Sequence, residues 1–208
     1  MAPRARSKGV ALVTALCVLV ALMSLALSAA HSALNAEKSA RNERDRHIAF
    51  QAAEAGLSDA ERDIEGGNHP GSARAALFAH ASALGFVAGC GRDPGAANVG
   101  LCQLAPAGQA PAWQVAELAG PDDVASAATP YGKFTGAVLP TGGAALPAKA
   151  SRYIIELMPL VRAGEDAGPS RAANLYRITA IGFGVRLHTQ VVLQSFYRKV
   201  APLQGGVQ

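Results

Sequence analysis

The hydrophobic and polar positions divide the first 65 residues into two halves with different patterns. From Val10 to Ala30 no residue carries a charge, and Arg4, Arg6 and Lys8 precede this run. An apolar run of about 20 residues is long enough to cross a bilayer as a helix. We therefore expect a transmembrane helix over residues 10–30. The basic residues in front of it favour an N-terminus in the cytoplasm.

The second half of the segment is amphipathic. Between Ala33 and Glu65 most residues favour helix, and the stretch contains no proline and a single glycine. One apolar face of a helix recurs at alternating steps of three and four residues. This stretch supplies such a series in Phe50, Ala53, Leu57, Ala60 and Ile64. We expect Phe50, Leu57 and Ile64 to dock the helix on a folded domain.

A cluster of helix-ending residues follows at Gly66, Gly67 and Pro70. The expected helix therefore covers residues 10–66 and, at 1.5 Å per residue, is roughly 80 Å long. Such a helix is too long for an ordinary globular fold. We expect its membrane half to lie in lipid and its amphipathic half to lie against a domain formed by residues 67–208.

Three interpretations of the N-terminal segment are open. A secretory signal peptide would be cleaved at a small-x-small pattern, which Ser28 and Ala30 offer, although its apolar core is usually about 7–15 residues. A plain uncleaved anchor is the second. In the third, Gly9 marks the junction of leader and helix, an arrangement that resembles the leader of prepilins. A membrane-embedded peptidase cuts such leaders after the glycine, so residues 1–9 would be removed and the mature chain would begin at Val10.

The C-terminal quarter predicts a sheet. Alternation of apolar residues indicates strands at 153–158, Leu175–Ile181 and Val185–Tyr197, with Gly182-Phe183-Gly184 as a tight hairpin connection. We also expect a short helix over Ser72–Leu84 and a strand over Ala112–Leu118, with loops elsewhere. The expected fold class is α+β, with the long N-terminal helix packed on a small antiparallel β-sheet.

The cysteines divide by location. Cys17 lies in the membrane run, where a small apolar filler is the ordinary role. Cys90 and Cys102 fall in the part expected to be exported, where thiols oxidise. The residues between them are rich in turn formers, and no nearby histidine or cysteine completes a metal site. We predict a Cys90–Cys102 disulfide.

Composition and motifs argue against other classes of function. The formal net charge is +4, of which the three basic residues before Gly9 supply three, leaving +1 for the rest. A net charge this small does not indicate a surface that binds nucleic acid. The histidines lack metal-ligand spacing, and no nucleophile elbow or phosphate loop occurs. The acidic pairs Asp122-Asp123 and Glu165-Asp166 are explained as solvated loops. We expect neither an enzyme nor a cofactor or metal.

Several segments spread over nearly the whole chain resemble one family, the PilX-type minor pilins of type IV pili. These segments are Gly9–Val13, Arg44–Arg46, Ala49–Ala55, Gly100–Cys102, Arg152–Glu156, Tyr176–Ala180 and Val191–Arg198. The most specific of them is Ala-Phe-Gln-Ala-Ala-Glu at residues 49–54, because the leader alone is shared by all pilin-like proteins.

This resemblance implies a non-enzymatic subunit that helps to initiate a pilus fibre or joins it. The implied location is the inner membrane, with a periplasmic C-terminal domain, and later the fibre. The implied partners are other minor pilins, the major pilin, the prepilin peptidase, the inner-membrane assembly machinery and, before assembly, the lipid bilayer. Val10 would be N-methylated after cleavage. The alternatives are a minor pseudopilin of type II secretion and a periplasmic binding protein on an uncleaved anchor.

One position departs from the family pattern. Most pilins carry glutamate at the fifth residue after the cleavage site, where it is thought to pair with the N-terminal amine of a neighbouring subunit. Here the residue is Thr14. A threonine in a helix can satisfy its hydroxyl on a carbonyl one turn back. Alternatively, the loss marks a subunit that needs no partner above it and lies at or near the fibre tip.

Overall fold

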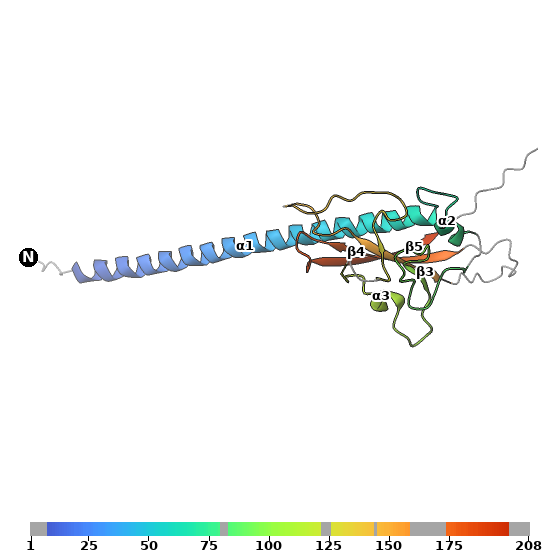
Figure 1. Cartoon of the computed structure of the whole chain (residues 1–208). Coiled ribbons are helices and arrows are strands. Elements are labelled where there is room, and N and C mark those ends of the chain that lie inside the picture. The colour runs from blue at the N-terminus through green and yellow to red at the C-terminus, as the bar shows by residue number, and fades with distance from the viewer. Residues whose placement is uncertain (1–7, 80–82, 122–125, 144, 159–173, 200–208) are drawn as a thin grey trace, which may run out of the picture. The chain divides into compact units, whose positions relative to one another are not determined.

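The computed structural model describes residues 8–79, 83–121, 126–143, 145–158 and 174–199. The chain divides into two compact units between Arg44 and Asp45. The first unit is, over its described residues, the first part of helix α1 (Lys8–Ile64), and the same helix continues into the second unit (Figure 1). The acidic pairs Asp122-Asp123 and Glu165-Asp166 lie outside the described residues.

The first unit carries the apolar half of the helix. Its large apolar side chains, from Val10 to Leu34, are between 48% and 72% exposed. By length and composition, α1 is the one described helix that is suited to cross a membrane. The expected long helix is thus confirmed, and no described residue of the first unit covers its apolar surface.

Glycines end α1 close to the expected position. The Gly67 N–H donates to the carbonyl of Arg62 at 2.9 Å, and the Gly66 N–H donates to that of Asp63 at 3.1 Å. This pair of bonds is the Schellman arrangement, which requires a left-handed residue after the helix. Gly66 supplies it with a φ of 118°. The helix therefore ends at Ile64, two residues before the expected boundary.

The second unit is built around a five-stranded sheet. After α1 come α2 (Ala73–Leu77), β1 (Leu101–Gln103), α3 (Ala112–Val115), β2 (Thr129–Pro130), β3 (Arg152–Met158), β4 (Leu175–Phe183) and β5 (Gln190–Arg198). The strand order is β1-β3-β4-β5, and β2 also pairs with β3. All these pairs are antiparallel except β1 with β3, which is parallel. The sheet is therefore mixed rather than purely antiparallel as expected.

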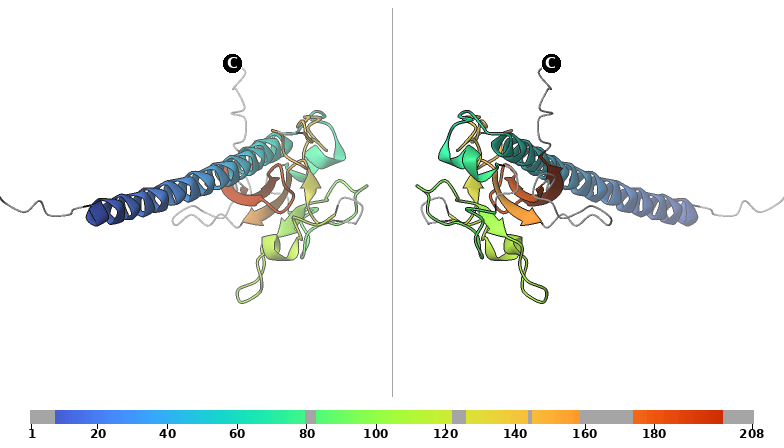
Figure 2. Two further views of the ribbon diagram at one scale, coloured as in Figure 1. Left: turned by 90° about the vertical axis from the view of Figure 1, so that its left-hand side faces the viewer. Right: turned by 90° about the vertical axis from the view of Figure 1, so that its right-hand side faces the viewer.

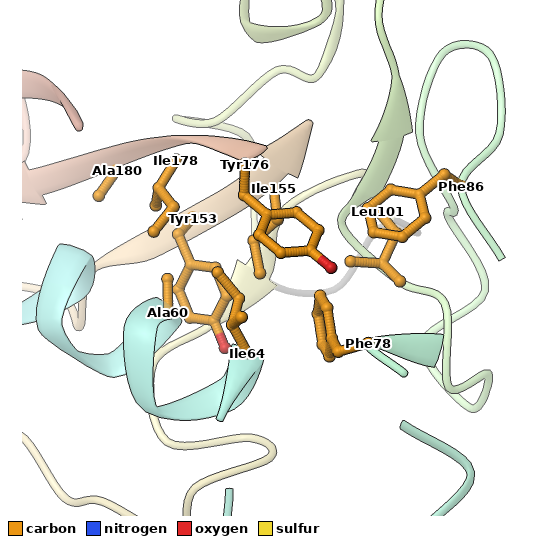
Figure 3. Packing of buried hydrophobic residues seen from close by; sticks show 10 residues of the cluster. All are labelled: Ala60, Ile64, Phe78, Phe86, Leu101, Tyr153, Ile155, Tyr176, Ile178 and Ala180. Carbon is orange, nitrogen blue, oxygen red and sulfur yellow. The ribbon is translucent and has the colours of Figure 1, made fainter. Parts of the chain in front are cut away.

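Each face of the sheet carries a core. Tyr153 and Ile155 of β3 belong to a buried cluster with the end of α1 (Figure 3), whereas Ile154 between them belongs to a second cluster with α3. This division follows from the alternation of side chains along a strand. Figures 1 and 2 show the docked part of α1 and the short α3 on opposite sides of the sheet. The α+β fold class is confirmed.

The predicted connection between the last two strands was wrong. Gly182 and Phe183 lie within β4 and pair with Val191 and Gln190 of β5, so they are not a hairpin turn. The turn instead covers residues 184–189, and the Gly184 N–H donates to the Thr189 carbonyl at 2.8 Å. Consequently β5 begins at residue 190 rather than 185.

The middle of the chain also differs from expectation. Residues 112–118 do not form a strand, because Ala112 and Ala116 are buried together in the second core. Their spacing of four residues matches one face of a helix, and α3 forms there. Among the described residues of the expected helix over 72–84, the helical part is α2, which Ser72 caps through a hydrogen bond from the Ala75 N–H at 3.1 Å.

Candidate functional site: the long helix and its docking surface

The face of α1 that meets the sheet is made of small residues. Ala49, Ala53 and Ala60 are fully buried. A side-chain carbon added at Gly182 of β4 would lie 2.1 Å from the Ala49 carbonyl oxygen and 2.3 Å from the Ala53 nitrogen. Real carbon atoms do not approach so closely, so only glycine fits at position 182. The helix backbone therefore packs directly on β4.

The three predicted docking residues differ in their placement. Ile64 is fully buried in the core on the α1 side, and Leu57 is half-buried against the same core. Phe50, by contrast, is 40% exposed and is not part of that core. The prediction for Phe50 was wrong because the buried face is centred on its neighbour Ala49. Successive residues of a helix point about 100° apart, and the alanine face allows the closer approach to the sheet.

Three aspartates on the buried face were missed by the sequence analysis. Asp45, Asp59 and Asp63 have exposures of 5%, 0% and 1%. Each accepts hydrogen bonds from a different segment of the second unit. The sequence did contain one sign of their burial. Their spacing places them on the same helix face as the buried alanines and Ile64. A carboxylate on such a face must have partners, because burying an unpaired charge is costly.

Asp45 holds the β4–β5 turn at the start of the docked half of α1. Its carboxylate accepts hydrogen bonds from the Val185 N–H at 2.5 Å and from the Thr189 hydroxyl at 2.7 Å. Arg186 lies 3.5 Å from it as an ion-pair partner. Burial acts to raise the pKa of Asp45. The hydrogen bonds from Thr189, Val185 and Arg186, with the charge of Arg186, outweigh burial and lower this pKa below its ordinary value.

Asp59 ties the middle of the docked half to the segment after β2. The Gly132 N–H donates to its carboxylate at 2.7 Å, and the Thr135 hydroxyl donates to its other oxygen. Burial raises the pKa of Asp59 above its ordinary value, and these two hydrogen bonds, which favour the charged form, do not fully offset it.

Asp63 forms the most deeply buried ion pair of the described residues, near the end of α1. Arg74 of α2 donates to it through Nη2 at 2.6 Å and through Nε at 3.1 Å. The Tyr153 hydroxyl of β3 donates to the same carboxylate at 3.0 Å. Arg74 also donates through Nη1 to the carbonyls of Ala97 at 2.8 Å and Val99 at 2.9 Å. Burial, with the nearby charge of Asp63, raises the pKa of Tyr153 well above its usual range. One guanidinium thus joins α1 and α2 to the loop before β1.

The predicted disulfide is present. Cys90 and Cys102 are joined across a separation of 12 residues, and both sulfur-bearing residues are buried in the second core. Cys102 lies in β1, so the bridge fixes the turn-rich segment 91–100 to the sheet. Cys17 is an exposed free cysteine in the apolar half of α1.

The residues predicted for processing lie at the start of the described helix. Gly9 and Val10 are both within α1, and Val10 is exposed. Thr14 donates its hydroxyl to the Ala11 carbonyl at 3.0 Å. This hydroxyl is therefore satisfied within its own helix, as the simpler interpretation of the residue predicts.

Hollows and clusters of the second unit offer little for chemistry. One hollow, about 780 Å³, lies beside β3, β4 and the β4–β5 turn. Its two cations, Lys149 and Arg152, both donate to the Gly120 carbonyl, at 2.8 and 3.1 Å. Across the part of the chain that the structure describes, no three histidine, cysteine or acidic side chains gather as a metal site would require.

Two family models match this chain. The one described as PilX N-terminal matches residues 8–58, and the one described as type IV pilus assembly protein PilX C-term matches residues 98–199. The first covers most of α1 and the second covers all strands of the sheet. The chain belongs to the PilX family of type IV pilus assembly proteins. It is a structural pilin and not an enzyme. No curated protein and no solved structure gives a match.

Membership of this family explains why α1 has two halves with different surroundings. The helix combines an apolar half that is exposed with a half that is fixed to a sheet by small residues and three carboxylates. The first half is suited to a membrane or to other apolar helices, and the second half packs on the sheet of the second unit. Partners in the pilus machinery follow from the family description.

Proposed function

We propose that this protein is a minor pilin that helps to initiate pilus assembly and lies at or near the fibre tip. The observation that carries the proposal is the continuity of α1 from the exposed apolar half into the docked half. A signal peptide needs no such link to the folded domain. A subunit that must leave the membrane and enter a fibre does need it.

The proposed maturation begins with cleavage after Gly9 and N-methylation of Val10. Residues 1–9 are then the cytoplasmic leader, residues 10–30 cross the inner membrane, and residues 67–208 form the periplasmic domain. The Cys90–Cys102 disulfide supports the periplasmic location, because such bonds persist in oxidising compartments. The basic leader supports a cytoplasmic N-terminus.

Assembly then transfers the apolar half of α1 from lipid to neighbouring helices. Exposing it to water would cost ~0.8 kcal/mol for each CH₂ group, so extraction must be coupled to contact with another subunit. The proposed contacts are with other minor pilins and the major pilin, and the inner-membrane machinery supplies the work. Ala15, Ala21, Ser24 and Ala26 on this half allow close helix approach.

The tip position rests on Thr14. The glutamate usual at this position would need a positive partner, because a carboxylate in lipid is costly. Thr14 carries no charge, so it neither requires nor offers a charged contact to a subunit above it. A subunit of this kind suits the end of a fibre. The family match favours pilus assembly over the pseudopilin alternative.

The processing step is tested with a Gly9→Val variant, expressed in a strain that lacks the native protein. We expect the variant to keep its leader, to stay in the inner membrane and to be absent from sheared fibres, with fewer fibres produced. Ser7→Ala is the matched control, because it alters the leader without touching the cleavage position. Normal fibre numbers with an uncleaved Gly9→Val variant would contradict the proposal.

The tip position is tested separately, by immunogold labelling of an epitope placed at the C-terminus. We expect gold at one end of each sheared fibre. Labelling spread evenly along the fibres would refute the tip placement while leaving the assignment as a pilin intact.

A further inference from the structure

The disulfide loop, residues 90–102, provides hydrogen-bond acceptors for Arg74 of α2. Nη1 of Arg74 donates to the carbonyls of Ala97 at 2.8 Å and of Val99 at 2.9 Å. The same guanidinium forms the buried ion pair with Asp63 at the end of α1. One side chain therefore connects the loop that the disulfide closes to the end of the long helix.

The second part of the disulfide loop is held on the sheet by hydrogen bonds between buried residues. The Thr129 hydroxyl of β2 donates to the Val99 carbonyl at 2.9 Å. The Ile155 N–H of β3 donates to the Gly100 carbonyl, also at 2.9 Å. Strand β1 follows at once and pairs with β3. This part therefore keeps its place through contacts that do not involve the disulfide.

The first part of the disulfide loop, residues 91–98, depends more on the disulfide. The structure describes all of these residues, and none belongs to a helix or strand. Gly91 bonds to the backbone of residues 100–101, beside the disulfide itself. Arg92 and Lys133 each add an exposed hydrogen bond to a backbone carbonyl, which stabilises little because water competes for both partners. The disulfide constrains this part because closing the loop removes most of its alternative conformations.

Opening the disulfide would release one acceptor of Arg74. Ala97 belongs to the first part of the loop, whereas Val99 belongs to the part that the sheet holds. Arg74 is 4% exposed, and a buried donor without an acceptor is costly. Its helix, α2, has five residues, which is too short to be stable alone. Arg74 recovers a partner only by moving toward water, and that movement weakens its contact with Asp63.

We propose that the Cys90–Cys102 disulfide is a redox-sensitive switch for the end of α1, and that Arg74 transmits its state. With the bridge closed, the first part of the loop holds Arg74 against Asp63. Reduction by a dithiol breaks the S–S bond, gives two cysteine thiols and converts the dithiol to its own disulfide. The end of α1 is then held less firmly, whereas its docked beginning, held by Asp45 on the β4–β5 turn, is unaffected.

The role of this switch in the cell rests on the proposed function. Closing the bridge transfers two electrons and two protons from the thiols to a disulfide-bearing oxidant of the exported compartment. The end of α1 is therefore fixed on the second unit only after export. The switch itself is a property of the second unit, so it is tested on the purified protein.

The test is hydrogen–deuterium exchange of the full-length protein in a non-ionic detergent, with Cys17→Ala in every sample. A variant with Cys90→Ala and Cys102→Ala lacks the bridge and leaves no buried hydroxyl in its place. We expect its backbone amides at residues 59–64 to exchange faster than in the bridged protein, with an increase several-fold larger than at residues 45–53. General destabilisation would give equal increases, because all these amides would exchange through the same unfolding.

The matched control is Asp45→Asn, which acts on the other end of the docked helix. Asp45 accepts hydrogen bonds from the β4–β5 turn and has no described contact with Arg74 or with the disulfide loop. This variant keeps the disulfide. We expect the opposite pattern of exchange, with a larger increase at residues 45–53 than at residues 59–64.

The coupling must also act in the reverse direction, since linkage between two sites is reciprocal. Asp63→Leu with Arg74→Met removes the connection without leaving an unpaired charge. At a fixed ratio of reduced to oxidised dithiol, we expect this double variant to have a several-fold higher equilibrium ratio of thiol to disulfide at Cys90 and Cys102. Asp45→Asn should have the same ratio as the protein without substitutions. This measurement keeps the native cysteines, so it decides the question where the alanine variant does not fold.

Two results would overturn the proposal. The first is an equal increase in exchange at residues 59–64 and 45–53 of the folded protein without the bridge. The second is a thiol-to-disulfide ratio that Asp63→Leu with Arg74→Met changes no more than Asp45→Asn does. Neither result bears on cleavage after Gly9, so the proposed function stands or falls by its own experiments.

Discussion

Removing the carboxylate of Asp63 should destabilise the second unit strongly. Asp63→Ala leaves the guanidinium of Arg74, which is 4% exposed, with hydrogen bonds to two carbonyls but without its counter-charge. It also removes the acceptor of the Tyr153 hydroxyl. Breaking a buried pair by removing one partner costs about 3–5 kcal/mol. A typical domain has a stability of about 5–15 kcal/mol, so the variant should lose a large share of it.

The assay is urea unfolding of the full-length protein in a non-ionic detergent. Trp113 is the only tryptophan, and it is half-buried against the second core, so its fluorescence reports unfolding of this unit. Glu37→Ala is the matched control, because Glu37 pairs with Arg41 in the exposed part of α1. Exposed pairs one helical turn apart contribute only about 0.3–0.5 kcal/mol.

A double variant separates the ion pair from simple loss of packing. Replacing both partners, as Asp63→Leu with Arg74→Met, removes the unpaired charge, and such replacements are often tolerated better than a single removal. We expect this double variant to be more stable than Asp63→Ala. If Asp63→Ala shifts the unfolding midpoint no more than Glu37→Ala does, the buried pair described here is not formed.

Three further predictions use the same assay. Replacing Cys90 and Cys102 together by serine should cost roughly 3 kcal/mol, the value expected for closing a loop of this length, and reduction of the native protein should have the same effect. Ile64→Ala should cost about 2–5 kcal/mol as a buried truncation, whereas Phe50→Ala should cost less than about 1 kcal/mol; equal effects would contradict the corrected docking face. Asp45→Asn should be destabilising at neutral pH. Because the folded pKa of Asp45 is lowered, its contribution is present above the unfolded pKa and is lost as the pH falls through the folded pKa, so the two proteins should converge in stability only at acid pH.

The sequence predicted the parts of this fold that depend on local pattern. The long helix follows from an uncharged run joined to a helix-favouring stretch, and its end follows from Gly66 and Gly67. The strands β3 and β4 follow from alternation, and the disulfide follows from two cysteines in a segment expected to be exported. Each of these features depends on residues that lie close together in the sequence.

The features that were missed depend on contacts between distant residues. Phe50 is the largest residue of its stripe, yet Ala49 is the residue that faces the sheet. The reason is that Gly182 lets the backbone of β4 lie directly against the backbone of α1. The aspartates at positions 45, 59 and 63 look like surface residues until their partners, up to 144 positions away, are known. Gly182-Phe183-Gly184 resembles a turn locally. However, β4 pairs with β5 over nine residues, and the last two of these β4 residues are Gly182 and Phe183.

The mass of the N-terminal peptide of this chain, isolated from sheared fibres, tests the central claim most directly. The account predicts a peptide that begins at Val10 and carries one additional methyl group, so that the apolar half of α1 remains on the assembled subunit. A chain that begins near His31 would lack that half and could not enter a fibre through it, and this result would contradict the account.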